Sequence, residues 1–103
     1  YLTAETKDVE VDFFVKWRIK DVPAFYRATS GGSEAQTRAL LTPIVKNTLR
    51  DDINQLTLQQ VVSSGRSELT QRLLKPINAA ASTLGIEVVD VRIKRIDLPQ
   101  DSQ

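Results

Sequence analysis

The stretch that decides the fold runs from Val9 to Ile19 and reads VEVDFFVKWRI. Strict alternation of this kind is typical of a half-buried β-strand. Weaker alternation in residues 2–6 predicts a preceding arm, with a turn at Lys7-Asp8, so we expect an N-terminal β-hairpin. The apolar residues that share the expected core face are Val9, Val11, Phe13, Val15, Trp17 and Ile19.

A further strand is predicted from Ile86 to Leu98, before Pro99. Its expected core face consists of Val89, Val91 and Ile93. The adjacent pair Val88-Val89 breaks the alternation, which predicts a β-bulge or a change of face at that point.

Between the strands, apolar residues at helical spacing predict two long helices, 35–56 and 64–84, and short helical segments at 24–29 and 57–62. Pro43 lies inside the first long helix and predicts a kink or a restart, and Pro76 predicts a kink in the second. Gly85 follows the second long helix as its expected stop. The expected N-caps are Asp21, Ser33 and either Ser63 or Ser64.

This order of elements predicts an α+β fold in which strands and helices are segregated. We expect one domain over residues 1–103. Its small antiparallel sheet, formed by the N-terminal hairpin and the C-terminal strand, would be covered on one face by the two long helices and short helical turns.

The composition is that of a soluble globular domain, with 41% hydrophobic and 26% charged residues. The formal net charge of +1 gives no electrostatic indication of nucleic-acid binding. The chain contains no His, Cys or Met. The first two absences remove the commonest general base and any thiolate nucleophile. The lack of an initiator Met leads us to expect a piece of a longer protein.

We find no catalytic, cofactor or metal site in the sequence. Ser63 and Ser64 have no His to activate them, and a Ser–Lys pair has no supporting motif. Asp51 and Asp52 are adjacent on a helix, so their side chains diverge by about 100°. Gly31-Gly32-Ser33 lacks the remainder of a phosphate-binding motif and is interpreted as a turn with a helix cap.

Four residues are candidates for a partner interface: Trp17, Arg92, Lys94 and Arg95. The three cations alternatively form a solvated strand face, with ion pairs to Glu10 and Asp12 across the sheet. Trp17 alternatively belongs to the core, since it shares a face with Val15 and Ile19.

Two stretches resemble a known superfamily in their residue identities as well as in their hydrophobic pattern. They are residues 6–21, TKDVEVDFFVKWRIKD, and residues 84–99, LGIEVVDVRIKRIDLP. Both look like the stomatin/prohibitin/flotillin/HflK-HflC superfamily, known as the SPFH or band 7 domain, and are most similar to its HflC-like members. The helix around residues 49–53 and the helix start at 64–66 match further elements of that family.

The resemblance implies a non-enzymatic, membrane-associated scaffold. HflC-like members have an N-terminal anchor, a two-part SPFH domain and a C-terminal helical region, so residues 1–103 would be the second SPFH part. They lie on the periplasmic side of the bacterial inner membrane, where they assemble with an HflK-like protein and modulate an FtsH-like protease. In this interpretation the membrane is contacted only through an anchor outside these residues.

Three alternatives remain open at this point. A stomatin-like scaffold would share the fold but act with another membrane protease or a channel. A serine hydrolase would use Ser63 or Ser64, and a nucleic-acid module is the remaining class. If the scaffold interpretation holds, this stretch alone is expected to be a monomer or a weak dimer, with ring closure supplied by other segments.

Overall fold

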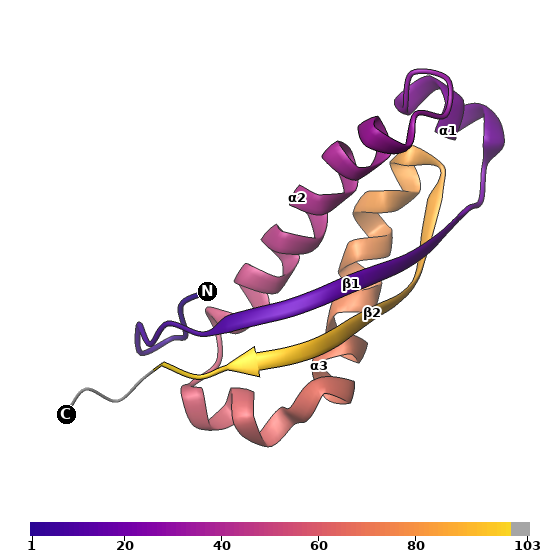
Figure 1. The fold of residues 1–103 in the computed structure, drawn as a ribbon. Coiled ribbons are helices and arrows are strands. Elements are labelled where there is room, and N and C mark those ends of the chain that lie inside the picture. The colour runs from indigo at the N-terminus through magenta and orange to yellow at the C-terminus, as the bar shows by residue number, and fades with distance from the viewer. Residues whose placement is uncertain (100–103) are drawn as a thin grey trace.

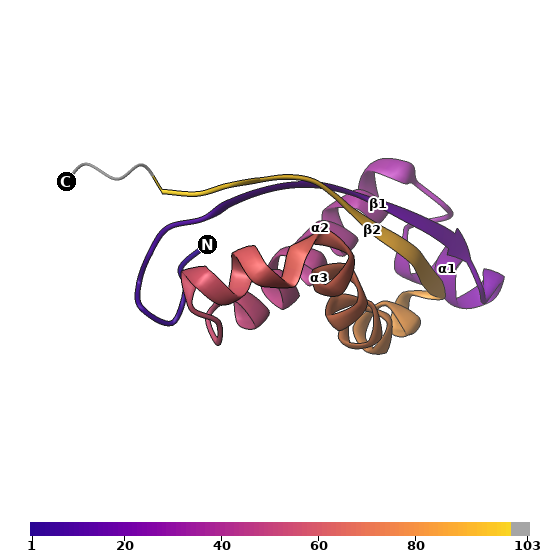
Figure 2. The same ribbon diagram turned by 90° about the horizontal axis from the view of Figure 1, so that it is seen from below.

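The computed structural model describes residues 1–99 and has two layers, a two-stranded antiparallel sheet and a layer of helices (Figure 1). The two long helices lie on the same side of the ribbon formed by the strands (Figure 2). The α+β fold class predicted from the sequence is confirmed. The elements in chain order are β1 (Glu10–Ile19), α1 (Val22–Ala28), α2 (Glu34–Ile53), α3 (Leu58–Ala81), a short 3-10 helix (Ser82–Leu84) and β2 (Ile86–Asp97).

The expected N-terminal hairpin is wrong in its first arm. Residues 2–6 form no strand of the sheet; a single bridge pair joins Leu2 to Asp8. The chain turns earlier than predicted, because Thr3 N–H donates to the Lys7 carbonyl and Thr6 adopts a positive φ of 61°. The Ala4 N–H donates to the Leu56 carbonyl, which ties this loop to the segment after α2 instead of extending it along β1.

β1 and β2 pair in an antiparallel register that places Val15 opposite Val91 and Trp17 opposite Val88. The register shifts twice, and each shift leaves one residue of β2 without a partner, Val89 and Lys94. The predicted bulge at Val88-Val89 is therefore confirmed, whereas the bulge at Lys94 was not anticipated.

The first bulge corrects the predicted core face of β2. Val88 is buried and Val89 is 55% exposed, the reverse of the expectation. The extra residue at the bulge allows Val88 and Val91, three positions apart, to face the helices together. Ile19 is also misassigned, because at this last residue of β1 the side chain is 45% exposed.

Helix ends follow the predicted caps in the first half of the chain. Asp21 accepts a hydrogen bond from Ala24 N–H, and Ser33 accepts one from Gln36 N–H. α2 continues through Pro43, and α3 continues through Pro76, without non-helical backbone at either proline. Both prolines are exposed, and each leaves one carbonyl of its helix without a helical donor.

The predicted cap of the second long helix is wrong. The helix starts at Leu58, where Thr57 and Gln60 form a reciprocal capping box. α3 consists of two segments separated at Gly65, whose φ of 73° and ψ of 174° are essentially restricted to glycine, and the predicted short helix at 57–62 lies in the first of them. Ser63 and Ser64 precede this break, so neither caps a helix: the Ser63 hydroxyl donates back to the Gln60 carbonyl.

The core lies between the sheet and the two long helices. α3 packs directly beneath β2, and α2 packs against α3. Gly85, with a φ of 72°, ends the 3-10 helix and turns the chain into β2. The largest fully buried side chains are Leu49, Ile53, Leu69, Leu73, Ile77 and Ile86.

Candidate partner surfaces

The outer face of the sheet, which the helices leave uncovered, holds the three candidate cations. Arg92 lies 3.6 Å from Asp90, and Arg95 lies 3.1 Å from Asp97, in both cases on the same strand. Lys94, the bulged residue, reaches across to Asp12 at 3.9 Å. One of the predicted cross-strand ion pairs is therefore present. Apart from Asp90, whose side chain is 32% exposed, these side chains are about half exposed or more, so such pairs contribute little to stability.

The same face has a large aromatic side chain, Phe14, among its charges. Phe14 is 43% exposed, and the Lys94 ammonium lies 6.0 Å from the centre of its ring. This separation is at the outer limit of a cation–π contact. The outer face is thus mainly charged, with Phe14 at its middle.

Trp17 lies on the opposite, helix-facing side of the sheet. Its side chain is half-buried, and its ring centre lies 6.0 Å from that of Phe25 in α1, at an interplanar angle of 37°. The structure therefore separates the candidates: three cations lie on the outer face and Trp17 on the inner face. Their role in partner contact stays a prediction.

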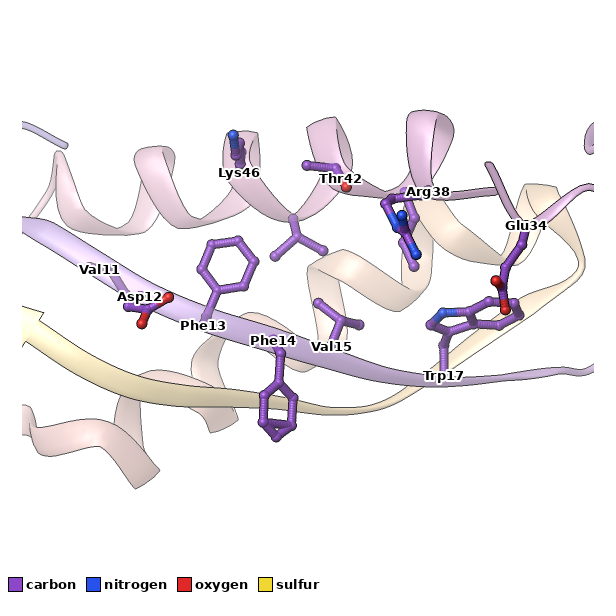
Figure 3. A pocket seen from close by; sticks show the side chains of 12 residues that line it. Val11, Asp12, Phe13, Phe14, Val15, Trp17, Glu34, Arg38, Thr42 and Lys46 are labelled. Carbon is purple, nitrogen blue, oxygen red and sulfur yellow. The ribbon is translucent and has the colours of Figure 1, made fainter. Parts of the chain in front are cut away.

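Trp17 borders a groove that the sequence did not reveal (Figure 3). The groove has a volume of about 590 Å³ and runs between β1 and α2. Phe13, Val15 and Trp17 point into it from the strand, whereas Phe14 points to the other side (Figure 3). Its wall on α2 includes Arg38, Thr42 and Lys46, which follow one another at intervals of four residues and so share one side of the helix.

The groups considered for catalysis serve structural roles. Asp52 pairs with Arg72 of α3 at 3.2 Å, and Asp51 pairs with its neighbour Arg50 at 3.1 Å, so the two carboxylates diverge as expected. The Ser64 hydroxyl accepts a hydrogen bond from Arg72. Within residues 1–99, neither Ser63 nor Ser64 is hydrogen-bonded to a lysine.

No cluster of three or more potential metal ligands occurs within the described part of the chain. Burial raises the pKa of the Tyr1 phenol above its ordinary value of 10.0. The phenol therefore stays neutral near pH 7.

The complete sequence, residues 1–103, matches the SPFH domain / Band 7 family. The chain belongs to this family. It is 41% identical to Protein HflC of Haemophilus influenzae, over 98% of this chain and 35% of that protein. It is 38% identical to Protein HflC of Buchnera aphidicola subsp. Schizaphis graminum, over 96% of this chain and 37% of that protein.

A third relative has a name that states a role. The Modulator of FtsH protease HflC of Escherichia coli K12 is 30% identical over 98% of this chain and 42% of its own length. The SPFH chain thus spans about two-fifths or less of the length of these curated relatives. Among the helices of residues 1–99, none combines the length and apolar character needed to cross a membrane.

Proposed function

We propose that this SPFH chain is a non-enzymatic scaffold domain of an HflC-like protein, which assembles with an HflK-like protein and modulates an FtsH-like membrane protease. The observation that supports this most directly is the similarity, over 98% of the chain, to a relative named as a modulator of FtsH protease. The hydrogen bonds of Ser63 and Ser64 within the helical layer and the ion pairs of Asp51 and Asp52 are consistent with a scaffold.

We further propose that residues 1–103 form the second part of an SPFH domain, located on the periplasmic side of the bacterial inner membrane. The relatives' greater length supports this division, since they have room for an anchor and further helical segments. Such a domain would act by packing side by side with neighbouring SPFH units.

The outer sheet face is the surface we propose for contact with a neighbouring unit, with Arg92, Lys94 and Arg95 as its charged residues. Each of these cations forms an ion pair with a nearby carboxylate, so positive and negative charges alternate on the surface. Alternating charge selects a partner by complementarity more than it raises affinity. Trp17, on the inner face, would be an anchor for a partner that reaches the β1–α2 groove.

Co-purification of the full-length protein tests the proposed function. A tagged form, extracted in mild detergent, should retain both an HflK-like protein and an FtsH-like protease. Failure to retain either one would overturn the specific assignment. Retention of a different membrane protease or a channel would instead support the stomatin-like alternative.

A charge-reversal variant tests the outer face separately. Arg92→Glu combined with Arg95→Glu should weaken retention of the HflK-like protein while leaving the fold unchanged. Arg27→Glu combined with Lys75→Glu, a double reversal at exposed positions of α1 and α3 outside both proposed surfaces, serves as the control. Equal retention by all three forms would exclude the outer face as the contact.

A fluorophosphonate probe tests the hydrolase alternative. We expect no specific labelling of the chain. Labelling that disappears in a Ser63→Ala or Ser64→Ala variant would overturn the non-enzymatic assignment.

A further inference from the structure

The two edges of the sheet differ in how their backbone groups are satisfied. On β2, the Asn78 side chain donates to the Val88 carbonyl at 3.0 Å and accepts from the Val88 N–H at 2.7 Å. Thr70 donates to the Val91 carbonyl at 2.7 Å, and Arg66 donates to the Lys94 carbonyl at 2.9 Å. Side chains of α3 therefore close the outer edge of β2 along most of its length.

β1 has no corresponding closure. One of its edges pairs with β2, and within residues 1–99 no group outside that pairing forms a hydrogen bond with the backbone of Glu10–Ile19. Both bulged residues belong to β2, so β1 itself is a regular strand of ten residues. Proteins commonly protect such an edge with bulges, prolines or a covering segment.

The β1–α2 groove lies along this open edge. Asp12 and Phe14 of the outer face line it together with Val15 and Trp17 of the inner face, which places the groove around the edge and not only beneath the strand. Adjacent helices lie about 8 to 10 Å apart, whereas adjacent strands lie about 4.8 Å apart. Two helices thus span more width than two strands, and the groove is the part of the helical layer that the sheet leaves uncovered.

We propose that the open edge of β1 and the β1–α2 groove bind an extended peptide of another protein as a third, antiparallel strand. Its alternate apolar side chains would enter the groove over Arg38, Thr42 and Lys46. Strand addition of this kind derives affinity from backbone hydrogen bonds and specificity from the pockets for alternate side chains.

The charges of β1 define the partner further. Its outward side chains are acidic in the first half, Glu10 and Asp12, and basic in the second half, Lys16 and Arg18, with Phe14 between them. Within the described residues, Glu10 and Lys16 form no ion pair. An antiparallel partner should therefore place basic residues beside Glu10 and Asp12 and acidic residues beside Lys16 and Arg18.

The β1 segment itself has this pattern, since reversing its direction places Glu10 opposite Arg18 and Asp12 opposite Lys16. A symmetric dimer through two β1 strands is nevertheless disfavoured. Its two-fold axis would keep the helices of both copies on one side of the sheet. Both α2 helices would then lie beneath the line where the two β1 strands pair, and would compete for the same space. A peptide of residues 10–19 has no α2 helix and so avoids this overlap, which makes it a suitable probe.

The binding test uses the chain and a capped peptide of residues 10–19 carrying Trp17→Phe. Trp17 of the chain is then the sole indole in the mixture and borders the groove, so its fluorescence reports occupation. We expect saturable binding to the wild-type chain. A peptide with Val15→Pro, which cannot maintain the strand pairing, should bind at least about tenfold more weakly.

Two variants of the chain locate the site. Thr42→Phe places a ring in the groove and should weaken binding by about tenfold, since the apolar side chains of the peptide lose their space. Ala39→Phe is the matched control, because it adds the same ring at an exposed position of the same helix. Circular dichroism checks that both variants retain the fold.

A charge exchange tests direction and register. Lys16→Glu in the chain should weaken binding of the original peptide about fivefold. A peptide that also carries Asp12→Lys should restore it, because these two positions are opposite each other only in the antiparallel register centred on Phe14.

Three outcomes would overturn the proposal. These are equal binding of a scrambled peptide, equal binding to the Thr42→Phe and Ala39→Phe chains, and a chain dimer through β1 that excludes the peptide. None of these results depends on an HflK-like or FtsH-like partner, so failure here is distinguishable from failure of the proposed function.

Discussion

Single polar side chains of α3 determine how the sheet edge of β2 is completed. Asn78 satisfies both the N–H and the carbonyl of Val88, at the edge of β2 that is turned away from β1. Asn78→Ala should lower the free energy of unfolding by about 2 kcal/mol, because two partly buried backbone groups lose their partners. Gln71→Ala, at an exposed position of the same helix, should change it by less than about 0.5 kcal/mol. Urea denaturation of the three proteins measures the difference, and equal midpoints would contradict this role of Asn78.

Arg72 is a second residue whose role depends on its neighbours in space. It joins α3 to Asp52 of α2 with side-chain exposures of 32% and 20%, and its guanidinium also donates to the Ser64 hydroxyl. Arg72→Ala should cost about 1 to 2 kcal/mol, less than a fully buried pair would lose. Arg50→Ala, which removes an exposed pair with Asp51, should cost no more than about 0.5 kcal/mol. A double-mutant cycle with Asp52→Asn isolates the pair, and a coupling energy near zero would show that Arg72 acts through packing alone.

At the scale of elements, Gly85 fixes the join between α1 and β2. A Cβ at this position would lie 2.4 Å from the Asp21 carbonyl oxygen and 2.6 Å from Phe25 N. Gly85→Ala should therefore destabilise the chain by about 3 kcal/mol or more, since backbone atoms would have to move. Gly31→Ala is the matched control, with a φ of 84° but no atom within 4 Å of the added carbon, and should cost about 1 kcal/mol. Similar thermal midpoints for the two variants would contradict the close approach.

Most elements could be predicted from the sequence because their signals are local. Asp21 and Ser33 cap the helices they were expected to cap, and the adjacent valines at 88 and 89 correctly indicated a bulge. Local signals failed where a more distant contact decided the result. The Ala4 N–H bonds to the Leu56 carbonyl, which replaced the first arm of the hairpin by a loop.

The β1–α2 groove was missed for a related reason. Arg38, Thr42 and Lys46 have the same spacing as any solvated helix face, and only the distance between α2 and β1 distinguishes them. The closure of β2 had a weak signal, because Arg66, Thr70 and Asn78 lie on one line along α3 beside the buried positions Leu69, Leu73 and Ile77. Polar residues on such a line do not reveal whether they bind water or a strand edge.

At the scale of the whole molecule, the described chain is elongated, with extents of 53 × 21 × 20 Å and a Cα radius of gyration of 15.1 Å. A compact domain of this length would have a radius of gyration of about 13 Å. The excess arises because β1 and β2 are long and pair only with each other, so the layers extend in one direction. An elongated unit exposes a large fraction of its surface, which suits side-by-side packing.

The hydrodynamic behaviour of the chain follows from this shape and from the proposal that other segments of the protein supply the ring-closing contacts. In sedimentation velocity, residues 1–103 should migrate as an elongated monomer of 11.5 kDa or a weak dimer, more slowly than a sphere of equal mass. Small-angle scattering should give a radius of gyration nearer 15 Å than 13 Å. Stronger self-association is not expected, because the charged outer face can form only weak, screened ion pairs with a second copy. The open edge of β1 is likewise inaccessible to a second copy, because α2 obstructs it. A stable large ring formed by these residues alone would show that the domain contains its own closure contacts, and would overturn the proposal that other segments of the protein supply them.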